Sequence, residues 1–189
     1  MRNRWLVAAV AVYAAAIAGS NFLITHVGIA VPGTSAHLTP VGFGLLAPSG
    51  VWAAAVSFPA RDFVQRIGGR RWGYTAILLG GAVSWLVSDP RIALASAATY
   101  LASESADMAV YTPLQRKYFT PAVVASGAVA AVVDSVLFLH LAGIPAGAAV
   151  VSGLILGKLW VVLASGPVTY SLRQKIPAGK EAHADLHAH

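Results

Sequence analysis

Six stretches of mostly apolar residues alternate with short polar segments along the chain. They cover residues 5–27, 47–66, 72–87, 92–112, 122–142 and 148–170. A helix needs about 20 apolar residues to cross the hydrocarbon core of a bilayer. The third stretch is shorter than this, and the other five are long enough. The pattern predicts an all-α polytopic membrane protein with six transmembrane helices. Between the first two, a segment rich in Gly, Pro and Thr (28–47) predicts an ordered outer loop or a re-entrant piece.

The basic residues fall in alternate loops, which orients a polytopic chain because cytoplasmic loops are enriched in Lys and Arg. One set of loops and ends contains Arg2, Arg4, Arg66, Arg70, Arg71, Arg116, Lys117, Arg173, Lys175 and Lys180. The other set contains only Arg91, close to Asp89. We therefore expect both termini in the cytoplasm and a multi-pass location in the plasma (inner) membrane.

The domain organisation predicted is a single six-helix transmembrane domain over residues 1–175, followed by a flexible cytoplasmic tail at 176–189. The tail contains His183, His187 and His189, but no metal site is predicted there. Residues 1–20 have the basic start and apolar core of a signal peptide. The apolar run continues past Ser20, so we expect an uncleaved helix.

Composition supports this class. Of the 189 residues, 57% are hydrophobic and 11% are charged, whereas soluble domains have about 25% charged residues. The balance excludes a disordered chain and a nucleic-acid-binding arm. With no cysteine, the chain has no disulfide, thiolate metal site or thiol nucleophile. No soluble-enzyme motif is present, so we expect no catalytic residue and no cofactor.

Polar residues within the predicted spans are the candidate functional residues, because each ionisable group there costs about 2.5–3.5 kcal/mol to insert. They are Asn21, Asp62, Glu104, Asp107, Asp134 and Lys158. The rise of a helix, about 1.5 Å per residue, places Glu104, Asp134 and Lys158 near the midplane. Glu104 and Asp107 share a helix face.

The pairing of these charges has two interpretations. In the first, Lys158 forms a buried ion pair with one carboxylate that only fixes helix packing. Asp62 is expected near the cytoplasmic end beside Arg61, where both side chains extend toward water. Even then, two carboxylates have no cation, which predicts a polar cavity in the membrane centre. Trp160 lies at a similar depth and either stacks on a planar ligand or faces lipid.

Several motifs resemble those of the VUT family, the six-span YhhQ-like queuosine precursor transporters. Their order along the chain is Ser20-Asn21, Pro48-Ser49-Gly50 with Phe58 and Asp62, Ser103-Glu104-Ser105-Ala106-Asp107, Ser126 with Asp134-Ser135 and Phe138, and Lys158 with Pro167 and Tyr170. One stretch departs from the family. A glutamate followed by Tyr-Gly is usual after the aspartate of the second span, whereas this chain has Arg66 in place of that carboxylate, which indicates a divergent branch.

The resemblance implies uptake of a 7-deazaguanine, such as 7-cyano-7-deazaguanine, its aminomethyl form or queuine, by alternating access. A guanine-like edge presents two adjacent donors, which one carboxylate can accept together. We assign this role to Glu104 or Asp134, with Asn21 as a second polar contact and Trp160 or Tyr100 as stacking residues. Asp107 either tunes the pair or carries a proton.

The alternative is a substrate-binding subunit of an energy-coupling-factor transporter for another small vitamin-like solute. That class also has six spans and a first helix rich in small residues. Its energy must come from an ATPase module, since nothing in this chain binds ATP. Expected partners are thus a purine-like small molecule and the bilayer, with no nucleic acid; a homodimer and an ATPase module remain open. A membrane enzyme or a purely structural membrane protein is the third class.

Overall fold

The computed structural model describes residues 2–87, 90–115, 117–143, 147–172 and 175. This part of the chain forms six helices, one for each predicted apolar stretch. They are α1 (Arg2–His26), α2 (Val51–Gly68), α3 (Arg70–Val87), α4 (Pro90–Leu114), α5 (Phe119–Leu141) and α6 (Ala148–Leu172). The predicted helical class is therefore confirmed.

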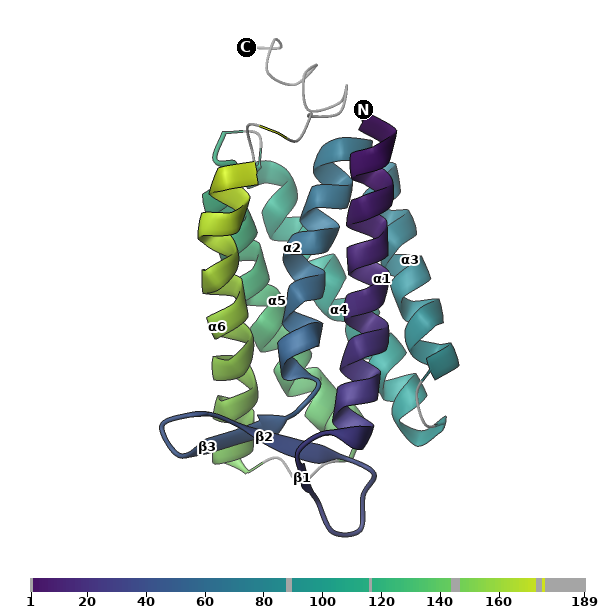
Figure 1. The fold of residues 1–189 in the computed structure, drawn as a ribbon, viewed down its shortest axis with the longest axis vertical. Helices are drawn as coiled ribbons and strands as arrows, with labels where there is room; N and C mark the ends of the chain where they lie inside the picture. Colours follow the sequence, from purple (N-terminus) through teal and green to yellow (C-terminus); the bar gives the residue numbers. More distant parts are fainter. Residues whose placement is uncertain (1, 88–89, 116, 144–146, 173–174, 176–189) are drawn as a thin grey trace.

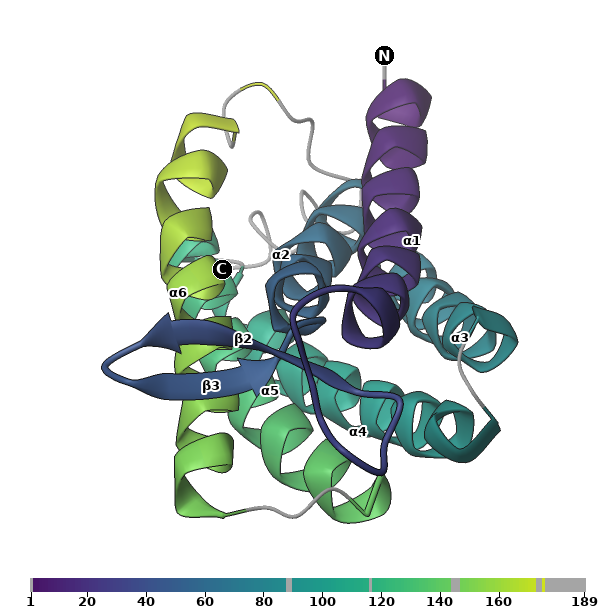
Figure 2. The ribbon, with the colours of Figure 1, turned by 60° about the horizontal axis from the view of Figure 1, so that its bottom comes forward.

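The helices pack side by side as an elongated bundle (Figure 1). Helix α2 contacts every other helix, and Figure 2 shows it surrounded by them on most sides. The start of α1 and the end of α6 lie at one end of the bundle. We call this the terminal end.

A small antiparallel sheet covers the opposite end, which we call the sheet end (Figure 1). Its strands are β1 (Ile29–Ala30), β2 (His37–Gly42) and β3 (Leu45–Pro48), in the order β1-β2-β3. Phe43 connects β2 to β3 with a positive φ of 53°, which suits a tight turn between two glycines. The segment from 28 to 47 is ordered, as predicted, but it lies across the bundle and does not re-enter it.

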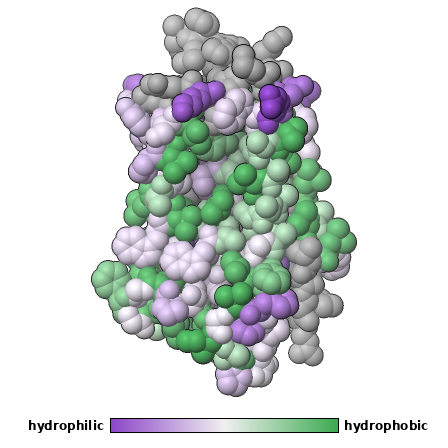
Figure 3. All heavy atoms as spheres, in the orientation of Figure 1, coloured by the Kyte–Doolittle hydropathy of each residue, from purple (hydrophilic) through white to green (hydrophobic). Residues whose placement is uncertain are grey.

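The outer surface of the bundle is apolar. Val7 and Leu78 are each 67% exposed, and Leu86 is 80% exposed. Figure 3 shows many apolar residues across the middle of one face, with strongly hydrophilic residues near both ends. Among the described residues, α1, α5 and α6 are long and apolar enough to cross a membrane. Helices α2 and α4 contain buried charged residues, and α3 has only 18 residues.

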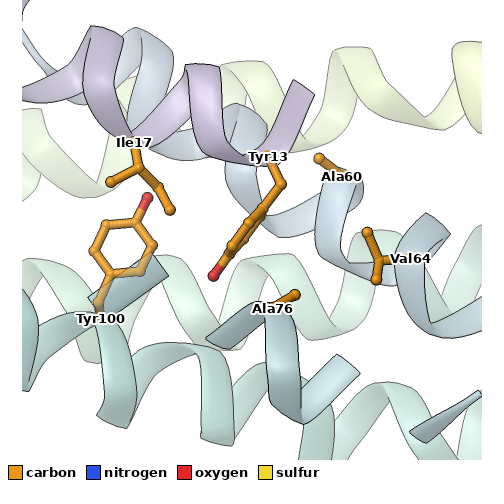
Figure 4. Packing of buried hydrophobic residues seen from close by; sticks show 6 residues of the cluster. All are labelled: Tyr13, Ile17, Ala60, Val64, Ala76 and Tyr100. Atoms are coloured by element: carbon orange, nitrogen blue, oxygen red, sulfur yellow. The ribbon is translucent and has the colours of Figure 1, made fainter. Parts of the chain in front are cut away.

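The interior between the first four helices is closed by small and aromatic residues (Figure 4). One buried cluster joins Tyr13 and Ile17 of α1 to Ala60 and Val64 of α2, and includes Ala76 of α3 and Tyr100 of α4. The alanines allow the helices to approach closely, and the two tyrosine side chains fill the space that remains between them. This packing holds α2 and α4 at fixed depths, and these two helices provide most of the buried charges.

Candidate functional site

The acidic residues that the structure describes all point into the helix bundle, and they form two groups. Asp134 of α5 pairs with Lys158 of α6. Asp62, Glu104 and Asp107 surround a single arginine, Arg61 of α2. The two groups lie at different depths along the bundle.

The first group consists of the ion pair between the Lys158 Nζ and the Asp134 Oδ2. The side chain of Lys158 is 2% exposed and that of Asp134 is 14% exposed. The Ser103 hydroxyl of α4 lies 3.4 Å from the other Asp134 oxygen and donates to it. The sequence interpretation in which Lys158 pairs with one carboxylate is what the structure shows, and the carboxylate is Asp134.

This ion pair lines a polar cavity of about 50 Å³ near the sheet end. Residues of α1, α2, α4, α5 and α6 form its walls. They are Ser20, Asn21, Ile24, Pro48, Gly50, Val51, Ala54, Ser96, Thr99, Tyr100, Asp134, Phe138, Leu154 and Lys158.

Three polar atoms in these walls are buried and have no hydrogen-bond partner among the described residues. They are the Asn21 Nδ2, the Thr99 Oγ1 and the Tyr100 hydroxyl. A buried polar group without a partner costs about 1–3 kcal/mol. Their gathering around one cavity therefore indicates a site that takes water or a polar solute.

The amino end of α2 contributes to the same cavity. Gly50, Val51 and Ala54 line it, and Gly50, at the N-cap, makes no side-chain capping hydrogen bond. The first N–H groups of a helix have no partner within the helix and carry partial positive charge. The cavity thus combines an anionic acceptor, Asp134, with donors from Lys158 and the α2 backbone.

The size of the cavity limits what this conformation holds. One water occupies about 30 Å³ in the liquid, so about 50 Å³ is far too small for a bicyclic solute. A purine-sized ligand requires the surrounding helices to separate.

The second group, which we call the Arg61 cluster, consists of Arg61, Asp62, Glu104 and Asp107. The Arg61 Nη2 lies 2.7 Å from the Asp62 Oδ1 and 2.6 Å from the Asp107 Oδ2. Its Nε lies 3.2 Å from the Glu104 Oε2. All four side chains are completely buried. The expectation that Asp62 and Arg61 extend toward water is therefore wrong, although their pairing is correct.

Neighbouring polar side chains hold the Arg61 cluster in place. Ser57 donates to the Glu104 Oε1 over 3.1 Å, and the Arg61 Nη1 donates to the Gln65 Oε1 over 2.9 Å. The Tyr111 hydroxyl donates to the Asp62 carbonyl oxygen, and Ser126 of α5 donates to the Asp62 carboxylate. The cluster thereby connects α2, α4 and α5.

The predicted site residues therefore divide between two places. Asn21, Asp134 and Lys158 line the cavity together with Tyr100, whereas Asp62, Glu104 and Asp107 belong to the Arg61 cluster. Trp160 lines neither: it is 43% exposed, and its indole N–H donates to the Val41 carbonyl oxygen of β2.

Sequence reasoning missed the central place of Arg61 and the contribution of Thr99. Arg61 could have been singled out because it is one of three charged residues, with Asp62 and Arg66, in the second predicted span. Thr99 gave no signal, because a threonine in an apolar helix has an ordinary place in the packing.

The sheet packs against the helix ends beside the cavity. Val41, Ala47 and Val51 pack with Leu139 and Leu154 in one buried cluster. Strand β3 approaches α6 closely because Gly153 has no side chain, and a Cβ there would collide with the Leu46 carbonyl oxygen. The sheet is therefore held firmly against the helix ends at the sheet end of the bundle.

An apolar exterior and a closed interior with paired charges define a helical membrane protein with an internal polar site. Residues 83–172 match the family described as "putative vitamin uptake transporter". This part of the chain is thus similar to that family, which is also the family that the sequence motifs resemble. It includes Glu104, Asp107, Asp134 and Lys158. Comparison with curated proteins and with solved structures gave no match.

Proposed function

We propose that this protein imports a queuosine precursor, a 7-deazaguanine, by alternating access through the polar cavity. The observation that carries the proposal is the gathering of the Asp134–Lys158 ion pair and three partnerless polar atoms around one cavity. A polar planar solute would satisfy these groups at once. The family match supports uptake of a small solute, and the chemistry of the cavity supports the particular solute.

The edge of a 7-deazaguanine complements the cavity walls. The Asp134 carboxylate would accept hydrogen bonds from the ring N–H and the 2-amino group. The adjacent carbonyl oxygen would accept from Lys158 or from the first N–H groups of α2. Asn21, Thr99 and Tyr100 would take the remaining polar atoms. Each donor in the cavity wall would then face an acceptor of the ligand, and each acceptor a donor, as in small-molecule sites generally.

The proposed topology has six spans with both termini in the cytoplasm. Arg4, Arg70, Arg71 and Lys117 all lie at the terminal end of the bundle, and basic residues favour the cytoplasmic side. The sheet end then faces outward in the plasma membrane. The cavity lies nearer this end, and the Arg61 cluster lies between the cavity and the cytoplasm. Import therefore requires the sheet end and the Arg61 cluster to open in turn.

The test is uptake in a bacterial strain that neither makes nor imports queuosine precursors but contains the enzymes that use them. The strain expresses this chain and receives 7-cyano-7-deazaguanine, its aminomethyl form or queuine separately at low concentration. Queuosine in tRNA is then measured. We expect one compound to restore it, and failure of all three with the protein in the membrane would refute the proposal.

Variants link the uptake to the cavity. Asp134→Asn should lower uptake about tenfold or more, since a hydrogen bond to a charged group is worth about 1.5–3 kcal/mol. Ser105→Ala is the matched control, because this exposed hydroxyl donates only to the Leu101 carbonyl oxygen of its own helix. Wild-type uptake by Asp134→Asn would place the solute elsewhere.

A second candidate is the substrate-binding subunit of an energy-coupling-factor transporter. The observation in its favour is an apolar groove of about 420 Å³ between α1, α2 and α6, whose walls include Ala8, Ala9 and Ala164. Small residues in such a groove allow close approach of another helix. Copurification with an ATPase module, and uptake that depends on it, would favour this candidate over a self-contained carrier.

A further inference from the structure

The Arg61 cluster is separate from the cavity and has an unusual charge balance. Three carboxylates surround one guanidinium, and every side chain is completely buried. If all four groups were ionised, the cluster would carry two more negative charges than positive ones. None of these side chains is among the walls of the cavity, so a solute bound there would not neutralise them.

An excess of buried charge is unstable. Removing an ion from water costs several kcal/mol even after the protein relaxes, and carboxylates held close together resist being charged at the same time. The same guanidinium nitrogen contacts both Asp62 and Asp107, so these two carboxylates are close neighbours. The excess must therefore be neutralised by bound protons or by another cation.

The geometry favours protons. The Arg61 guanidinium already occupies the point where the three carboxylates converge, which leaves no shared centre for a metal ion. Among the described residues, no group of three or more acidic or histidine side chains is arranged to hold a metal. A proton needs no such centre, since it binds to one carboxylate oxygen.

Two buried oxygens offer places for an exchanging proton. The Asp107 Oδ1 and the Tyr13 hydroxyl have no hydrogen-bond partner among the described residues. The Tyr13 side chain is directed from α1 into the bundle (Figure 4) and lies within electrostatic range of Glu104 and Asp107. A protonated carboxyl group is both donor and acceptor, so protonation at Asp107 would give its partnerless oxygen a hydrogen to donate.

Other titratable groups face the cluster from the surrounding helices. Tyr100 and Tyr111 lie on the same face of α4 as Glu104. From α2, Arg66 stacks over the Phe119 ring at 4.1 Å.

The remaining titratable groups near the Arg61 cluster come from α3 and from the pair α5 and α6. Arg70 and Tyr74 of α3 line a different cavity together with Thr112, which follows Asp107 in α4. On the cavity side, Asp134 is already paired with Lys158.

A short polar path connects the cluster to the cavity. Ser103 and Glu104 are consecutive in α4, and Ser103 donates to Asp134 while Glu104 accepts from Ser57. Movement of α4 that widens the cavity would therefore also change the contacts of Glu104. This gives the two sites a physical means of coupling.

We propose that the Arg61 cluster is a proton-binding site, distinct from the solute cavity, whose protons exchange with water. Proton coupling of the import is its expected consequence, and this consequence rests on the proposed function. Glu104 and Asp107 are the proton carriers, and Arg61 holds the remaining carboxylate as an ion pair.

The direct test is infrared spectroscopy of the purified protein at neutral pH, which needs no solute. A neutral carboxylic acid has a carbonyl stretch separate from that of a carboxylate, and the band should shift in D₂O. Glu104→Gln and Asp107→Asn should each weaken the band, and the double variant should abolish it. Asp134→Asn is the matched control and should retain it. Because an amide replaces a neutral acid, the test variants should melt at wild-type temperature or above.

The outcomes are decisive. Absence of the band, a band that persists in the double variant, or a band that does not shift in D₂O would overturn the proposal.

Coupling is tested separately in proteoliposomes with labelled 7-cyano-7-deazaguanine. Glu104→Gln should keep solute counterflow and lose accumulation driven by a pH gradient. Wild-type protein that performs counterflow but ignores the gradient would overturn the coupling role. Absence of counterflow in the wild type would count against the proposed solute, and the infrared result would still decide the proton site.

Discussion

Lys158 and Asp134 illustrate how single residues set the energetics of this interior. Each is a charge that a bilayer disfavours, and each has the other as its ion-pair partner. Loss of one partner leaves an uncompensated buried charge, whereas loss of both removes the two charges together. Stability and function therefore respond differently to changes at this pair.

We predict that Lys158→Met lowers stability by about 3–5 kcal/mol, because Asp134 is left without its cation. The double variant Lys158→Met with Asp134→Asn should recover most of this loss but not uptake, since the solute loses its charged partners. Thermal unfolding in detergent measures the first effect and the queuosine assay the second. A double variant as unstable as the single one would mean that the pair does not compensate in this way.

Helix α6 shows how one element organises two neighbours. Its glycines differ in what surrounds them. At Gly153 an added methyl group would meet the Leu46 carbonyl oxygen of β3, whereas at Gly166 the nearest atom would be the Val124 Cγ2 at 3.6 Å. At Gly153 the helix can therefore approach the strand backbone this closely only because the residue has no side chain.

We predict that Gly153→Ala destabilises the protein by roughly 1–3 kcal/mol, as overpacking generally does. Gly166→Ala, in the same helix, should be neutral or stabilising by up to about 1 kcal/mol, because alanine favours a helix over glycine. Thermal unfolding of the two variants under identical conditions checks this. Equal melting temperatures would show that the sheet yields freely at Gly153.

At the scale of the whole molecule, the distribution of basic residues is the basis for the proposed orientation in the membrane. The basic residues gather at the terminal end, and the sheet covers the other end. Trp72 and Trp85, at opposite ends of α3, are both exposed, as expected for aromatic residues at the two bilayer surfaces. The chain therefore has chemically distinct ends separated by an apolar band.

The absence of native cysteine allows the topology to be measured directly. Phe43→Cys lies in the sheet turn and is 83% exposed in the wild type, and Tyr118→Cys lies at the terminal end at 51% exposure. A membrane-impermeant maleimide should label position 43 in intact cells and position 118 only after permeabilisation. The reverse pattern, or labelling of both in intact cells, would contradict the proposed orientation.

The sequence was sufficient for the helices because their signals are local. Each apolar stretch encodes its own helix, and Gly69, with a φ of 89°, marks the break between α2 and α3. Asn21, Asp134 and Lys158 were found as candidates because a polar residue in an apolar stretch stands out without any knowledge of its neighbours. The segment before Pro48 was predicted to be ordered, but its strand pairing had no comparable pattern.

What the tertiary structure decided was which polar residues meet. Helix rotation and depth place Lys158 against Asp134 and gather three carboxylates around Arg61, while Trp160 turns outward to the sheet. The pairs Lys158–Asp134, Arg61–Glu104 and Arg61–Asp107 join residues 24 to 46 positions apart in the chain, so no local pattern encodes them. Hydropathy along the chain determined that a polar interior exists. Only helix packing divided it into a cavity and a separate charged cluster, because side-chain contacts depend on the relative positions of whole helices.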